Sequence, residues 1–234
     1  MTDMHIHIKN GIYVQKIFDD YVKKCIDMDL KKVVFLDHGN RVSTKHREVL
    51  SSKESILAFD QMINKFRRES SNLTILKGIE IDYSNDINFR RKTLEILNLG
   101  KFEWVVGAIH SLKFNNTSDY LNAVIDMINN YKIHCVAHIK LEEDYHLYMD
   151  LLKYICKLCS SKNIFIEINT SDRSIWTDEQ MIDMINLFDE FNVQTCFSSD
   201  AHCVDEIGYK IKETKRKILQ WQKEKLICGY CMQD

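Results

Sequence analysis

The chain alternates seven times between a short apolar run and a longer segment whose apolar residues have helical spacing. The short runs have the length of strands, and the longer segments suit the helices that connect parallel strands. We predict strands at 2–8, 32–36, 73–79, 103–109, 133–137, 164–170 and 193–198, and helices at 14–29, 54–70, 87–98, 118–130, 143–160, 177–191 and 205–226. Seven such units favour a closed parallel α/β barrel, although periodicity alone is also compatible with a doubly wound open sheet.

The composition excludes several classes of partner. The chain is 45% hydrophobic and 28% charged, and its formal net charge of -2 leaves no basic surface for nucleic acid or an anionic membrane. No apolar run approaches the roughly 20 residues of a membrane-spanning helix. The N-terminus lacks the basic and apolar regions of a signal peptide, so we expect a cytoplasmic protein. With no linker in view, we expect a single domain over residues 1–234; the sequence carries no signal for the oligomeric state.

Eight cysteines include two C-x-x-C pairs, Cys156/Cys159 and Cys228/Cys231. The first pair lies within a predicted helix, and we interpret it as two core thiols. The second pair looks more like a zinc knuckle. The pairs lie far apart in the sequence, so we predict no zinc ribbon from them and, for a cytoplasmic chain, no disulfide.

Side chains of the kind that bind metals recur at the ends of the predicted strands. His5 and His7 alternate in the first strand and should project from one face, with Met4, Ile6 and Ile8 on the other. Other strands end in similar residues: Asp37, His38, Glu80, His110, His138, Glu167, Asp200 and His202. In a β/α barrel these ends meet on one face, where sites are built.

One histidine on a strand is more often a core or surface residue than a ligand. The joint pattern differs, because imidazoles and carboxylates crowded together without coordination are costly to bury. Mixed nitrogen and carboxylate ligands suit zinc, manganese or iron. The set exceeds the needs of one ion, so we expect two or three divalent ions, which activate water and neutralise phosphate in hydrolysis.

Seven short motifs follow one another along nearly the whole chain: His5-x-His7, Asp37-His38-Gly39-Asn40, residues 78–83 (GIEIDY), 106–111 (VGAIHS), Ala137-His138, 167–171 (EINTS) and 199–202 (SDAH). Together and in this order, they resemble the PHP (polymerase and histidinol phosphatase) family. The resemblance implies a distorted, TIM-like (β/α)7 barrel. The motifs at 78–83 and 167–170 are most similar to the histidinol-phosphatase branch.

The resemblance also implies roles for individual residues. One ion would be bound by His5, His7, Glu80 and Asp200, a second by Glu80, His110 and His138, and a third by His38 and His202. Of these, Glu80, Asp200 and His202 are the implied catalytic residues. The family has another His or Asp shortly after the first motif, but residues 8–13 contain neither. Either Asn10 or water replaces this ligand, or the third ion is weakly bound or missing.

Further residues are candidates for the substrate phosphate and for orienting ligands. Arg173 lies where histidinol phosphatases commonly carry an arginine, and Arg41 follows His38. Guanidinium binds phosphate in a fork, although a solvated loop charge is the alternative for both. Asp82 could orient a ligand, and Glu167 could do the same or satisfy backbone groups.

These observations predict a metal-dependent phosphatase for a small phosphorylated substrate. The single substrate that we predict is L-histidinol phosphate, which would be hydrolysed to L-histidinol and phosphate as in histidine biosynthesis. The alternatives are a PHP phosphatase or nuclease acting on nucleotides, a phosphotyrosine phosphatase, and a degenerate metal-binding module; an amidohydrolase is more distant. The near-neutral charge counts against the nuclease, and the nearly full ligand set counts against the degenerate module.

Overall fold

The computed structural model describes residues 1–8, 15–40, 50–70, 72–110, 112–173 and 176–231. Within them lie the strands β1 (Thr2–His7), β2 (Lys32–Leu36), β3 (Thr74–Asp82), β4 (Trp104–Ala108), β5 (Cys135–Val136), β6 (Phe165–Asn169) and β7 (Thr195–Ser198). The helices are α1 (Gln15–Asp27), α2 (Lys53–Glu69), α3 (Ile87–Gly100), α4 (Thr117–Asn130), α5 (Met149–Lys162), α6 (Asp178–Phe191) and α7 (Ile211–Cys231), with short 3₁₀ turns at Tyr145–Tyr148 and Val204–Glu206.

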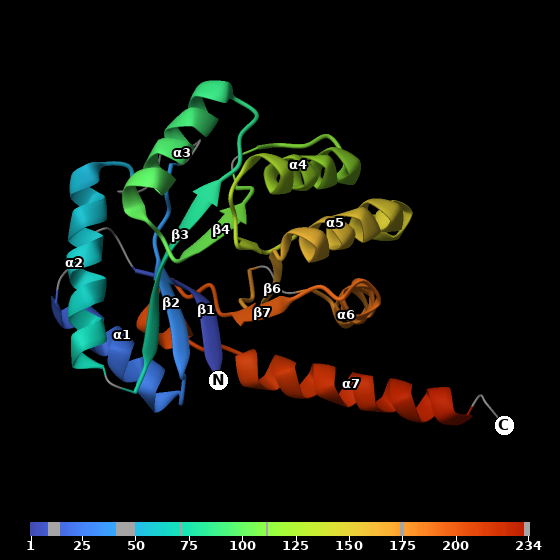
Figure 1. Ribbon diagram of the computed structural model, residues 1–234. Coiled ribbons are helices and arrows are strands. Elements are labelled where there is room, and N and C mark those ends of the chain that lie inside the picture. The colour runs from blue at the N-terminus through green and yellow to red at the C-terminus, as the bar shows by residue number, and fades with distance from the viewer. Residues whose placement is uncertain (9–14, 41–49, 71, 111, 174–175, 232–234) are drawn as a thin grey trace.

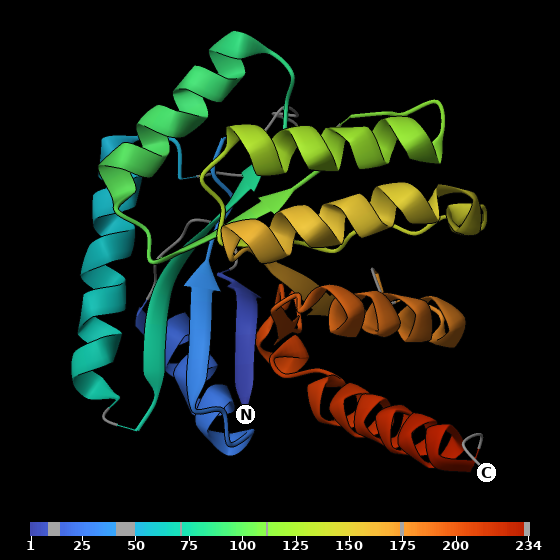
Figure 2. The ribbon, with the colours of Figure 1, turned by 45° about the vertical axis from the view of Figure 1, so that its right-hand side comes forward.

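The strands form one parallel sheet in the order of the sequence, from β1 to β7. The sheet curls until its first and last strands meet, because His7 N donates to Ala201 O at 2.8 Å and Ile6 bridges to Ala201. The helices cover the outside, with α4, α5, α6 and α7 following one another around it (Figures 1 and 2). The predicted seven-stranded α/β barrel is therefore confirmed. No described helix is long and apolar enough to cross a membrane.

Two apolar clusters fill the fold on opposite faces of the strands. The smaller lies inside the barrel and includes Val34, Trp104 and Val106. The larger lies between strands and helices, where Ile79 and Ile81 of β3 join the helical side chains. This period-two alternation turns Glu80 and Asp82 toward the inner face. Cys156 and Cys159 of α5 are fully buried in the larger cluster, as predicted for core thiols, whereas the side chains of Cys228 and Cys231 lie outside the described residues.

The prediction that Met4, Ile6 and Ile8 share one face of the first strand is wrong. Met4 packs in the inner cluster, and Ile6 and Ile8 pack in the outer one. The pairing of β1 with β2 shifts register between Asp3 and Ile6, and such an irregularity changes which residues face each side. His5 and His7 are nevertheless both buried.

Some element boundaries differ from the predicted ones. β3 continues to Asp82 because β4 pairs with it along Gly78–Asp82, so Glu80 lies inside a strand and not beyond its end. The predicted helices at 143–160 and 205–226 begin later, at Met149 and Ile211, because a 3₁₀ turn precedes each one.

Candidate metal centre

Glu80 lies at the middle of the predicted ligands, at the C-terminal ends of the strands, with 1% of its surface exposed. Its Oε1 is 3.1 Å from His138 Nε2 and 3.2 Å from His110 Nε2. Its Oε2 is 2.8 Å from His38 Nδ1 and 3.4 Å from His7 Nε2. One carboxylate thus meets imidazoles from β1 and from the loops after β2, β4 and β5.

The first potential metal-binding group consists of His5, His7 and Asp200. The two Nε2 atoms are 3.0 Å apart, and Asp200 Oδ1 is 3.6 Å from His5 Nε2 and 3.4 Å from His7 Nε2. Tetrahedral ligands about 2.0–2.1 Å from a zinc ion would be roughly 3.3 Å from one another. The observed separations are therefore those of atoms that can share one ion.

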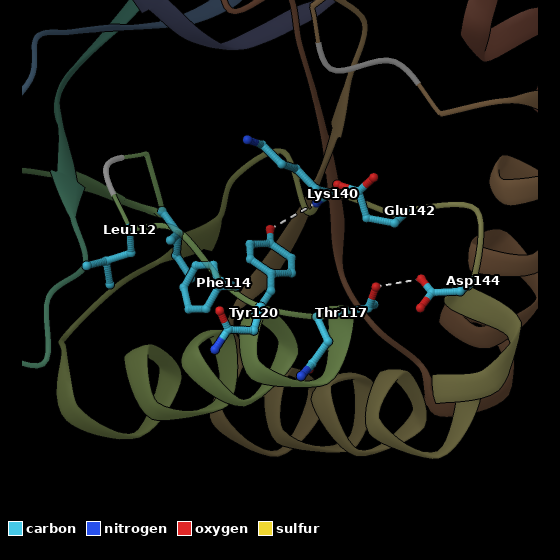
Figure 3. A pocket seen from close by; sticks show the side chains of 10 residues that line it. Leu112, Phe114, Thr117, Tyr120, Lys140, Glu142 and Asp144 are labelled. Carbon is cyan, nitrogen blue, oxygen red and sulfur yellow. Dashed lines mark hydrogen bonds between the residues drawn. The ribbon is translucent and has the colours of Figure 1, made fainter.

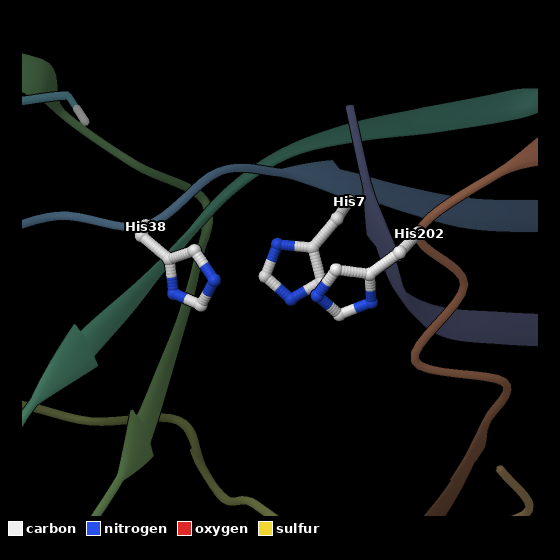
Figure 4. Close-up of side chains that lie close together, drawn as sticks. All are labelled: His7, His38 and His202. Carbon is white, nitrogen blue, oxygen red and sulfur yellow. The ribbon is translucent and has the colours of Figure 1, made fainter. Parts of the chain in front are cut away.

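Two further groups lie next to the first, and one of them shares His7 with it. His38, Glu80 and His110 form one, and His7, His38 and His202 form the other. In the latter, the His7 ring centroid lies 4.4 Å from that of His38 and 4.2 Å from that of His202 (Figure 4). His7 therefore stands beside the pair predicted for the third ion. Asn10, one of the predicted substitutes, lies outside the described residues.

Hydrogen bonds to Nδ1 orient two of the histidines. His5 Nδ1 lies 2.7 Å from Glu167 Oε1, and His202 Nδ1 lies 2.9 Å from Asp200 O. A carbonyl or an ionised carboxylate can only accept, so the hydrogen belongs on Nδ1 in both rings. In the neutral ring, Nε2 then carries the lone pair and directs it away from this partner, which is the arrangement that supports metal ligation.

Glu167 connects three segments behind the ligands. Besides His5, its Oε1 accepts from Ser198 Oγ at 2.6 Å, and its Oε2 accepts from His138 N at 2.8 Å and Asn169 Nδ2 at 3.1 Å. The orienting role considered for Glu167 is consistent with these contacts. Sequence reasoning missed Ser198 and Asn169; the spacing of Asn169, two residues after Glu167 in one strand, was the available signal.

Two ligand candidates have backbones in the left-handed region. His138 has φ of 27° and Asp200 has φ of 50°. Such conformations cost on the order of 1–3 kcal/mol in residues other than glycine and occur often at functional sites. The hydrogen bond from His138 N to Glu167 helps to hold the first, and Asp3 Oδ1 accepts from Ser199 N at 3.0 Å beside the second.

The cluster strongly perturbs its titratable groups. Burial by itself would lower the pKa of His5, but Glu167, Asp200 and Glu80 outweigh it and raise this pKa to about 10. Burial and Glu80 oppose each other in the same way at His110, whose pKa also rises to about 10. The nearby imidazoles overcome burial to hold the pKa values of Glu80 and Asp200 below their usual range.

His202 shifts in the opposite direction. Its burial, followed by the charge of His7, lowers its pKa to about 4. Among the described residues, Glu80 Oε2 and His110 Nδ1 are buried without a well-aligned hydrogen bond, although Glu80 Oε2 lies 2.8 Å from His38 Nδ1 and His110 Nδ1 lies 3.5 Å from Asp82 Oδ1. Bound cations would satisfy Glu80 Oε2 and the crowded imidazole nitrogens that face it. The donors are imidazole nitrogens and carboxylate oxygens, so the site fits zinc, manganese or iron.

Arg173 lies beside the cluster. Its Nη2 donates to Asp200 O at 3.0 Å and to Glu206 Oε2 at 3.1 Å, while about half of the side chain, 51%, is exposed. It lines a cavity of about 330 Å³ together with Ser199 and Tyr209. The guanidinium is thus placed where it could also reach an anion next to Asp200.

The other predicted residues have separate outcomes. Asp82 Oδ1 accepts from His110 N at 3.0 Å and lies 3.5 Å from His110 Nδ1, so it can position this ring. Arg41 lies outside the described residues, and its predicted role in phosphate binding stays a prediction.

Residues 3–171 match the PHP domain family. The chain belongs to the PHP family. With its ligand cluster, this membership confirms the predicted class of metal-dependent phosphoesterase. No curated protein matches the chain significantly.

Solved structures agree with the PHP fold. A proposed histidinol phosphatase, HisK from Listeria monocytogenes, has a TM-score of 0.72 at 17% identity, covering 91% of this chain and 99% of that one. HisK from Lactococcus lactis subsp. lactis, a histidinol phosphate phosphatase in complex with zinc, L-histidinol and phosphate, has a TM-score of 0.70 at 17% identity, covering 87% and 86%. A chain described with the metal-dependent tyrosine phosphatases YwqE of Bacillus subtilis and CpsB of Streptococcus pneumoniae has a TM-score of 0.54 at 15% identity, covering 87% and 80%.

Proposed function

We propose that this PHP protein hydrolyses a small phosphate monoester and that L-histidinol phosphate is its substrate. The observation that carries the reaction type is the convergence of six histidines, Glu80 and Asp200 next to Arg173. The choice of substrate is supported by the fold shared with the HisK structures, one of which holds L-histidinol and phosphate. It is also supported by the motifs of the histidinol-phosphatase branch.

The proposed roles follow from the contacts. His5, His7, His38, His110, His138, His202, Glu80 and Asp200 would bind two or three divalent ions. Such ions activate water and neutralise the phosphate charge. Glu167 keeps the Nδ1 hydrogen of His5 away from the ion, and Asp200 O does the same for His202. Arg173 would bind phosphate oxygens through its guanidinium, and Glu206 holds it beside Asp200.

The test is phosphate release from L-histidinol phosphate, compared with a phosphotyrosine peptide and a mononucleotide, with zinc or manganese and with a chelator. We expect turnover of L-histidinol phosphate that the chelator abolishes. Asp200→Asn should lower kcat/KM by a hundredfold or more, because an amide is a poor substitute for an ionised ligand. Asp205→Asn, at an exposed position close by in the sequence, is the matched control and should retain activity.

Preferred turnover of the peptide or the nucleotide would replace the proposed substrate and keep the reaction type. An absence of turnover by protein shown to contain metal would favour the degenerate module. The single domain over 1–234 and the cytoplasmic location stay predictions.

A further inference from the structure

The cavity of about 330 Å³ beside Arg173 is formed by the loops that follow β6 and β7. Two residues of its wall contact the metal centre, since Arg173 donates to Asp200 O and Glu206 accepts from His202 N. A larger cavity, of about 450 Å³, lies next to Tyr120 of α4 (Figure 3), and none of the ligand candidates is among its described lining residues. The smaller cavity is therefore the one where a guanidinium meets the ligand candidates.

Glu206, in the short turn after His202, makes both of its contacts in this cavity with a single carboxylate oxygen. Its Oε2 accepts from His202 N at 2.7 Å and from Arg173 Nη2 at 3.1 Å. His202 is a ligand candidate, and Arg173 is the residue proposed to bind phosphate. The position of this oxygen therefore sets where the guanidinium lies relative to an ion bound by His202.

The Arg173 side chain depends on few contacts, because about half of it is exposed. In the part of the chain that the structure describes, both hydrogen bonds of its guanidinium come from Nη2, one to Asp200 O and one to Glu206 Oε2. An ionised carboxylate is a stronger acceptor for guanidinium than a carbonyl is, so Glu206 is the stronger of the two anchors. Without this anchor, a long side chain at the surface would occupy several rotamers.

The backbone of the loop that carries Arg173 is held separately. The preceding residue, Asp172, accepts from Tyr209 OH at 2.8 Å and from Lys210 Nζ at 2.6 Å. Ser171 N, one residue earlier, donates to the side chain of Asn169 at 2.9 Å. A change at Glu206 should therefore release the Arg173 side chain and leave its loop in place.

We propose that Glu206 is a positioning residue, which holds the Arg173 guanidinium in place for the substrate phosphate. This inference rests on the proposed function. The carboxylate has two opposing effects: it fixes the guanidinium, which strengthens phosphate binding, and its negative charge repels phosphate, which weakens binding. Because this charge is paired with Arg173 and accepts a hydrogen bond from His202 N, we expect the first effect to be the larger.

The test compares wild-type protein with Glu206→Gln in the hydrolysis of L-histidinol phosphate at saturating metal. Glutamine keeps the size and an oxygen that can accept from His202 N, but it loses the charge that binds the guanidinium. We expect KM to rise about fivefold, the most that a partly exposed ion pair usually contributes, while kcat and metal affinity change little. Asp205→Asn is the matched control, because Asp205 is an exposed carboxylate in the same turn, and it should change none of these values.

A second pair of variants tests whether Glu206 acts through Arg173. Arg173→Ala should raise KM by itself, because it removes the proposed phosphate contact. Adding Glu206→Gln to Arg173→Ala should leave KM unchanged or lower it, because no guanidinium is left to position and the carboxylate then merely repels phosphate. The proposal is overturned if Glu206→Gln raises KM equally in both backgrounds, or if it keeps or lowers the KM of otherwise wild-type protein.

Binding of inorganic phosphate separates this inference from the choice of substrate. Calorimetry with metal-loaded protein should show binding that is about fivefold weaker in Glu206→Gln and unchanged in Asp205→Asn. If L-histidinol phosphate is not hydrolysed, the proposed substrate is wrong, and this titration still decides the role of Glu206. Equal phosphate affinity of Glu206→Gln and wild-type protein, or an absence of phosphate binding by wild-type protein, overturns the positioning role.

Discussion

At the scale of single residues, the centre depends on side chains that hold the ligands as well as on the ligands. Glu167 is the clearest example, because it is 1% exposed and accepts four hydrogen bonds, three of them from segments other than its own strand. It aligns the His5 ring through its side chain and the His138 segment through the backbone. These contacts join β1, β6, β7 and the loop after β5 just behind the ions that the site would bind.

Glu167→Gln should lower metal affinity by tenfold to a hundredfold, the range typical of groups that orient a metal-bound histidine. The amide has one acceptor oxygen in place of two and adds an NH2 group facing donors, so the His5 ring loses its fixed orientation. Competition with a metal-binding dye measures the affinity, and kcat at saturating metal separates binding from turnover. Glu179→Gln on α6, whose side chain is 76% exposed, is the control. An equal response of both variants would contradict the orienting role.

The sequence predicted the ligands better than the residues that hold them. A ligand follows its own strand, so its position can be predicted from a local pattern such as His5-x-His7. The bond from Ser198 to Glu167 joins residues 31 positions apart, and that from Ser199 to Asp3 joins residues 196 apart. No local period encodes such pairs. The inward turn of Met4 was missed for a related reason, since it depends on a register shift against β2.

At the scale of elements, Asp3 connects the first and last parts of the barrel. It is fully buried in β1; Oδ1 accepts from Ser199 N, and Oδ2 accepts from Ser199 Oγ at 2.6 Å and Gly208 N at 2.9 Å. Burial nevertheless raises the pKa of Asp3 to about 6, because its hydrogen bonds do not fully replace water. The residue thus holds the loop after β7 against β1, beside Asp200.

Asp3→Asn should destabilise the fold by about 1–3 kcal/mol, the usual cost of leaving buried donors without acceptors. The amide keeps one oxygen and directs an NH2 group at a backbone N–H or a hydroxyl. Urea unfolding followed by circular dichroism measures the change. Asp29→Asn is the control, because this side chain is 80% exposed and pairs only with Lys31 among the described residues. Equal stability of the two variants would show that Asp3 does not hold the barrel closed.

Gly78 in β3 lies where the inner face has no room for a side chain. A Cβ at this position would be 2.4 Å from Val34 Cγ1, 3.0 Å from Leu36 Cβ and 3.2 Å from Trp104 O. Side chains of β2 and a backbone carbonyl of β4 bound this space, so these neighbours cannot move apart without shifting the sheet. The position precedes Glu80 by two residues, and a shift here would move the central carboxylate.

Gly78→Ala should therefore destabilise the protein by about 1–3 kcal/mol, as overpacking of a filled core does, and should lower metal affinity. Thermal unfolding and metal titration measure the two effects. Thr74→Ala, at the exposed start of the same strand, is the control and should change both values little. A stable Gly78→Ala protein with unchanged metal affinity would mean that the inner face can expand at no cost.

At the scale of the whole molecule, the barrel brings several carboxylates and imidazoles together in one buried place. The negative charge of the carboxylates is compensated there by bound ions or by protons on the imidazoles. Five elements or loops supply the six histidines, and two of these, His5 and His110, have their pKa raised to about 10 by the surrounding carboxylates. At pH 7 both rings are then protonated in the metal-free protein. Metal ions and protons compete for the same nitrogen atoms.

Metal binding at pH 7 should therefore release protons, and the apparent affinity should rise with pH up to about 10. The pKa values of Glu80 and Asp200 lie below their usual range, so these carboxylates are already ionised near neutrality and contribute no protons. Calorimetric titration with manganese or zinc in two buffers of different ionisation enthalpy counts the protons. His146→Gln removes an exposed histidine that lies outside the three potential metal-binding groups, and it should leave the count unchanged. Binding without proton release would mean that the ions occupy a different site, because ligation of this cluster requires its histidines to lose their protons.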